Sequence, residues 1–118
     1  MIRLDKTIRK LQAVADSTVS VGTHVMVSFV DVTMDGSNNK GASQLTNGNL
    51  VADTDICAAP PQNFVREIDT VFITNKDSAA HTFTVKIDES ATDYICIVHS
   101  LSSGQSLIYE HNTGWSVL

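Results

Sequence analysis

The stretch VREIDTVFITNKDSAAHTFTVKI, residues 65–87, decides the fold of this chain. Its two halves, 65–74 and 81–87, place β-branched and aromatic residues at alternate positions. A period of two is typical of a strand with one buried face, and such residues favour strands over helices. Between the halves, residues 75–80 supply Asn, Asp and Ser, which stabilise turns through hydrogen bonds to nearby backbone groups. The pattern therefore predicts a β-hairpin.

An isolated hairpin is only marginally stable in water, so this one needs further strands to cover its apolar face. Similar short runs recur along the chain, and they predict seven or eight strands with turns every ~8–12 residues. The further strands are expected within residues 17–30, 50–59, 94–99, 106–109 and 115–118. This spacing predicts an all-β fold, a single antiparallel β-sandwich. A jelly roll is one form that it can take, and a small barrel is the alternative.

Composition supports one folded domain spanning residues 1–118 and excludes several functions. The chain is 42% hydrophobic and 18% charged, which suits a folded protein rather than a disordered one. Its net charge of −5 argues against a nucleic-acid partner, because neutralising phosphates needs clustered Lys and Arg. The uncharged run of residues 17–30 contains Ser, Thr, Gly and His among its apolar residues, so no membrane span is expected there. The amino terminus lacks the apolar segment of a signal peptide, which predicts synthesis in a cytoplasm.

Two segments suggest contacts with a partner. Residues 7–15 have helix-like spacing but can also run extended, and we favour an extended amino-terminal arm within residues 1–20. Residues 34–49 are rich in Gly, Ser and Asn and predict a long surface loop. Loops of this length are usually mobile or functional. For residues 34–49, partner contact and a simple connection are equally good interpretations.

The sequence predicts no catalytic, metal or cofactor site. The four histidines lie in separate segments and no G-x-S-x-G turn accompanies them, so a catalytic triad is not expected. Cys57 and Cys96 lack metal-ligand spacing and lie in apolar strand-like runs. We expect buried free thiols, with a single disulfide as the alternative. The chain is therefore predicted not to be an enzyme.

Several short motifs follow one another in the second half of the chain. Residues 58–60 read Ala-Ala-Pro, and residues 66–77 begin with Arg and end in Asn-Lys-Asp. Residues 81–85 read His-Thr-Phe-Thr-Val. Residues 101–109 have the form Leu-x-x-Gly-x-x-Leu-x-Tyr, and residues 114–117 begin with Gly-Trp.

In this order the motifs resemble small virion structural proteins of tailed bacteriophages. The resemblance covers about residues 58–118, with a looser echo in residues 25–33. It implies a β-sandwich that decorates or joins the phage particle, commonly as an oligomer, and is assembled in the host cytoplasm. Such proteins occupy different virion positions, including head decoration or cement, head-tail joining, and tail fibre or tip. The match does not separate these positions.

Our first hypothesis is a capsid decoration or cement protein that holds neighbouring subunits through protein contacts. The expected partners are copies of the same chain, with a trimer favoured, and the major capsid protein or another virion protein. The candidate interface residues come from the arm, the polar loop and the large aromatic side chains: Arg3, Arg9, Leu11, Asn38, Asn39, Leu45, Tyr109 and Trp115. For Trp115, a plug in the core is favoured over an interface anchor.

The second hypothesis is a receptor- or carbohydrate-binding module of a tail fibre or tip, or a head-tail joining component. A sugar site would need exposed aromatic side chains on one face, and the chain has only one Trp and two Tyr. The third, an enzyme, would require an acid-base pair that the sequence does not reveal.

Overall fold

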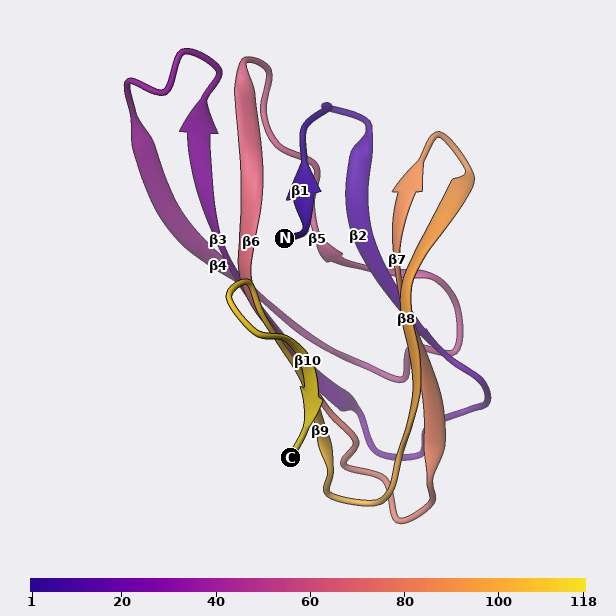
Figure 1. Ribbon diagram of the computed structural model, residues 1–118. Helices are drawn as coiled ribbons and strands as arrows, with labels where there is room; N and C mark the ends of the chain where they lie inside the picture. Colours follow the sequence, from indigo (N-terminus) through magenta and orange to yellow (C-terminus); the bar gives the residue numbers. More distant parts are fainter.

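The computed structural model describes residues 1–118 as two antiparallel β-sheets packed face to face, with no helix (Figure 1). The predicted all-β sandwich is confirmed. The ten strands are β1 (Arg3–Leu4), β2 (Arg9–Ala15), β3 (Thr23–Thr33), β4 (Asn39–Gly48), β5 (Thr54–Cys57), β6 (Phe64–Thr74), β7 (His81–Glu89), β8 (Thr92–Leu101), β9 (Ser106–Glu110) and β10 (Gly114–Val117).

The larger sheet, sheet A, has the strand order β10-β9-β6-β3-β4, and β1 also pairs with β6. The smaller sheet, sheet B, has the order β5-β2-β7-β8. Figure 1 shows β3, β4 and β6 in one layer and β2, β7 and β8 in the other. The core between the layers consists of the inward-facing residues of both sheets, with Leu4, Leu11, Val27, Val71 and Phe83 fully buried.

Residues 65–87 do form two strands, but the predicted hairpin is wrong. β6 pairs with β3 and β9 in sheet A, whereas β7 pairs with β2 and β8 in sheet B. Residues 75–80 therefore cross between the sheets. The buried Asn75 amide donates hydrogen bonds to the carbonyls of Ala79 and Leu101, which fixes this crossing. Alternation shows that a strand has one buried face, but it does not show which strand lies beside it.

The amino-terminal segment is extended, as expected, but it does not project as an arm. β2 is an inner strand of sheet B, paired with β5 on one side and β7 on the other. β1 pairs with β6 in sheet A, so residues 1–15 contribute to both layers. The reason is burial: Leu4, Leu11 and Ala13 are fully inaccessible to solvent and belong to the core.

The predicted loop at residues 34–49 is also wrong. Only residues 34–38 turn, and residues 39–48 form β4, which pairs with β3 from Val32↔Asn39 to Thr23↔Gly48. β4 lies at the edge of sheet A and most of its side chains face solvent. Hydrogen bonds between the backbones hold such a strand without apolar side chains, so its composition resembles that of a loop.

A buried ion pair links β3 to β6 within sheet A, and its arginine also binds the loop after β5. Arg66 on β6 donates from Nε and Nη2 to the two carboxylate oxygens of Asp31 on β3, at 2.8 and 2.9 Å. Its Nη1 donates to the Ala58 carbonyl oxygen at 2.8 Å, and its guanidinium lies 3.9 Å from the centroid of the Phe29 ring. Every polar edge of this buried side chain therefore has a partner.

Both cysteines are free. Cys57 is fully buried, and burial raises the pKa of its thiol to about 11. Cys96 is half-buried, and its thiol pKa is also raised by burial. The prediction of a buried free thiol is thus confirmed for Cys57 and holds in part for Cys96.

Candidate functional site

Two of the predicted interface residues are not free to meet a partner, and a third is half-buried. Leu11 lies in the core, and Tyr109 is buried with its hydroxyl accepting a hydrogen bond from the Ile2 amide at 2.8 Å. Trp115 is half-buried against Tyr109, with 5.1 Å between the ring centroids. Trp115 thus helps to close the core. The interface role is wrong for Leu11 and Tyr109, because each fills space between the sheets.

The other predicted residues remain accessible but are dispersed. Arg9 is held by Glu89, with 2.6 Å between Arg9 Nε and Glu89 Oε1, and by Asp5. Arg3 is exposed on β1. Asn38 and Asn39 lie at the turn between β3 and β4, and Leu45 lies in the middle of β4 with 75% of its surface exposed. Only Leu45 belongs to a larger apolar surface.

That surface is a row of apolar side chains across the outer face of sheet A. Met26 on β3 lies opposite Leu45 on β4 and opposite Phe72 on β6. Phe72 in turn lies opposite Ile108 on β9. The inward neighbours of these residues form the core, so alternation directs this row outward. Met26 is 41% exposed, which is unusual for a large apolar residue in an inner strand.

The row borders a surface groove of about 460 Å³. The groove is lined by His24, Val25, Met26, Leu45, Thr46, Asn47, Phe72 and Thr74. Its polar members are His24, Thr46, Asn47 and Thr74, and His24 Nε2 lies 3.5 Å from the Nζ of Lys76. No carboxylate lines it. A groove of this kind suits an apolar group better than an ion.

A second exposed apolar segment is β8. The sequence predicts a buried strand at residues 94–99, but Tyr94, Ile95 and Val98 are 53%, 66% and 53% exposed. β8 is the last strand of sheet B, so one of its sides has no neighbouring strand. A continuous apolar run does not distinguish a buried strand from an exposed edge strand.

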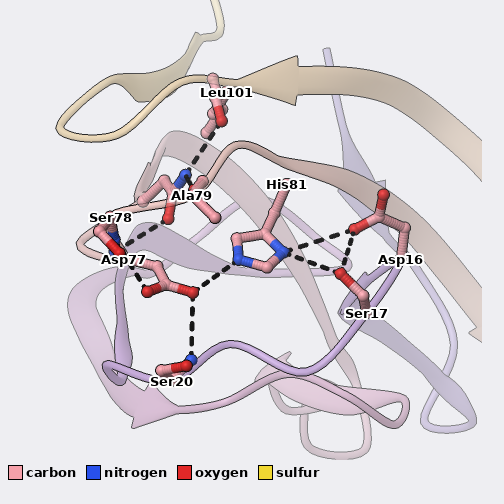
Figure 2. Close-up of polar contacts among 9 residues, drawn as sticks. Asp16, Ser17, Ser20, Asp77, Ser78, Ala79, His81 and Leu101 are labelled. Atoms are coloured by element: carbon pink, nitrogen blue, oxygen red, sulfur yellow. Dashed lines mark hydrogen bonds and ion pairs between the residues drawn. The ribbon is translucent and has the colours of Figure 1, made fainter.

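The structure also brings together a polar cluster that the sequence did not reveal, built around His81 at the start of β7 (Figure 2). His81 Nε2 lies 2.7 Å from Asp77 Oδ2, and Nδ1 lies 3.0 Å from Ser17 Oγ. Asp16 Oδ1 lies 3.6 Å from the same Nδ1. His81 and Asp77 are buried, whereas Ser17 and Asp16 are exposed.

Hydrogen bonds in this cluster stabilise its carboxylates. The bond to His81, with further ones from the backbone amides of Ser20 and Ser78, lowers the pKa of Asp77. A hydrogen bond to the backbone of Thr82 lowers the pKa of Asp16. Because an ionised carboxylate can only accept, His81 donates a hydrogen bond from Nε2 to Asp77 Oδ2, which leaves Nδ1 to accept one from the Ser17 hydroxyl.

The cluster has the composition of a Ser-His-Asp triad, but its surroundings favour a structural role. Ser17 has one hydroxyl proton, and Asp16 Oδ1 competes for it at 3.2 Å. The two main grooves of the surface contain neither Ser17 nor His81. The hydrogen bonds instead connect residues 16–20 to the crossing at residues 75–80. The contacts span more than 50 positions of sequence, so no local motif indicates them.

No group of three His, Cys, Asp or Glu side chains is placed to hold a metal ion. No helix is long and apolar enough to span a membrane. In the comparisons with known proteins, no family model, curated protein or solved structure matches this chain.

Proposed function

We propose that this protein is a structural component of a tailed bacteriophage particle, of the capsid decoration or cement class, and that it acts through protein contacts. The observation that carries the proposal is the apolar row on the outer face of sheet A with the groove beside it. Contiguous apolar surface of this kind marks sites of protein interaction. The resemblance of residues 58–118 to small phage virion proteins supplies the particle as the setting.

The structure changes how the contact would be made. The amino-terminal segment is part of both sheets, so it is not available to reach a neighbouring subunit. The surface that we assign to the capsid subunit is formed by β3, β4 and β6, which present Met26, Leu45 and Phe72. Docking of a capsid subunit there would bury apolar area on both sides, which stabilises the assembled particle without any chemical step.

The test is quantitative mass spectrometry of purified particles from the source that encodes the chain. A decoration protein should be present in many copies, in a fixed ratio to the major capsid protein. A handful of copies per particle would contradict the decoration role and would support the tail fibre, tip or head-tail joining position. Absence from the particles would overturn the proposal as a whole.

A further inference from the structure

β8 differs from the other edge strands of the sandwich. It spans ten residues, Thr92–Leu101, and pairs only with β7. Its outer side therefore presents backbone amide and carbonyl groups that no strand of this chain satisfies. Natural proteins usually protect such edges with charges, prolines or covering loops, because an open edge binds another strand.

The other edges of the two sheets are protected. The Gln44 side chain covers β5, donating to the Asp55 carbonyl at 3.2 Å and accepting from the Ala58 amide at 3.0 Å. β10 has only four residues. β4 is long but polar, and it carries Lys40. By contrast, residues 94–98 of β8 are Tyr-Ile-Cys-Ile-Val, with no charged side chain.

An irregularity in β8 places two exposed apolar side chains on the same face. Ile95 lies opposite Lys86 and Ile97 lies opposite Val85, so Cys96 is an extra residue in the ladder. After this bulge Val98 lies opposite Thr84. Since Lys86 and Thr84 share the outer face of β7, Ile95 and Val98 both face outward from sheet B.

We infer that β8 is a self-association edge, and that two copies of the chain pair through it in antiparallel fashion about a two-fold axis. With the axis between Cys96 and Ile97, Ile95 of each copy lies opposite Val98 of the other. Both exposed apolar side chains then gain a partner on the same face of a continuous eight-stranded sheet, twice the four strands of sheet B.

Charge at this edge does not oppose a second copy. Each copy carries a net charge of −5, so most contacts between copies are repulsive. The β8 edge avoids this repulsion because its central residues are uncharged, and the nearby Lys86 is already paired with Asp53 and Asp93 at 2.9 and 2.8 Å. A two-fold contact closes at two copies, which gives a dimer in place of the trimer that we expect from the sequence.

The test is the mass of the full chain in solution, measured by sedimentation over a range of concentrations. One strand pair buries less area than the about 1,200–2,000 Å² of a stable interface, so the mass should rise with concentration from 12.8 kDa to twice that value. Val98→Lys should abolish the rise, and Ile95→Lys should do the same. The matched control Leu45→Lys, an exposed leucine on another edge strand, should dimerise like the natural chain.

A monomer at every concentration, or a dimer that both lysine variants retain, would overturn the inference.

The register has its own test in chains that carry Cys96→Ala. A chain with Ile95→Cys mixed with a chain with Val98→Cys should form a disulfide-linked pair under mild oxidation, whereas neither should link to itself. Self-linkage of either chain would contradict the proposed register. These results do not depend on the proposed function, because they concern the isolated protein.

Discussion

At the scale of single residues, the buried Arg66–Asp31 pair holds one end of the sandwich together. Its bidentate geometry and the third bond to the Ala58 carbonyl leave the guanidinium fully paired. Asp31→Ala would leave Arg66 charged and buried without its carboxylate, and the free energy of unfolding should fall by about 3 kcal/mol. Asp69→Ala, which removes an exposed carboxylate 3.0 Å from His111, should cost less than about 1 kcal/mol. Denaturant unfolding of both variants measures the difference; equal losses would contradict the role of the buried pair.

The His81 cluster predicts an acid-dependent part of the stability. Hydrogen bonds hold the pKa of Asp77 below its usual value near 3.9, so its carboxylate favours the folded state above that pH. This stabilisation is lost as the pH falls through the lowered pKa of the folded state. Asp77→Asn should therefore lower the melting temperature near neutral pH and reduce its fall on acidification. Asp69→Asn serves as an exposed control. An unchanged acid profile for Asp77→Asn would show that the cluster does not stabilise the fold.

At the scale of elements, β2 shows that a local sequence pattern can predict an extended segment but not its place in the fold. Residues 7–15 have helix-like spacing that can also run extended, and this pattern does not distinguish a projecting arm from an inner strand. Deleting residues 1–15 removes β1 and β2, which leaves β5 without a partner in sheet B and exposes the core. We expect the truncated chain to lose cooperative thermal unfolding, whereas a chain that lacks only the exposed Met1 should still unfold cooperatively. A truncated chain that still unfolds cooperatively would support a separate arm.

Local patterns do not identify the neighbours of a strand, and this limit also explains the other differences between the predicted and the observed elements. The period of two in residues 65–74 and 81–87 predicted two strands correctly, because burial of one face is a local property. The assignment of β6 and β7 to different sheets depends on the buried contacts of Asn75 and on the neighbours β3 and β2, which are distant in sequence. β4 carries almost no apolar signal, and the Ser17–His81 contact joins residues 64 positions apart. The residues of the candidate site could therefore be brought together only from the structure, not from the sequence.

At the scale of the whole molecule, the sandwich presents two apolar surfaces on different sheets. The row on sheet A includes Met26 and Phe72, and the β8 edge on sheet B includes Ile95 and Val98. In our account the edge joins two copies while the row faces a partner, so a dimer would present two binding faces. Such a bivalent protein could link neighbouring subunits of a lattice, as a cement protein must.

The most direct test of this account is the number of copies that bind to undecorated particles, compared between the natural chain and two variants on sheet A. Leu45→Asp and Met26→Asp place a charge in the apolar row on the solvent-facing side, where the fold should tolerate it. Circular dichroism and thermal unfolding confirm that each variant is folded. The account predicts saturable binding of many copies of the natural chain and a loss of at least tenfold in affinity for each variant, which is about 1.4 kcal/mol. No binding of the natural chain, or equal binding of folded variants, would contradict it.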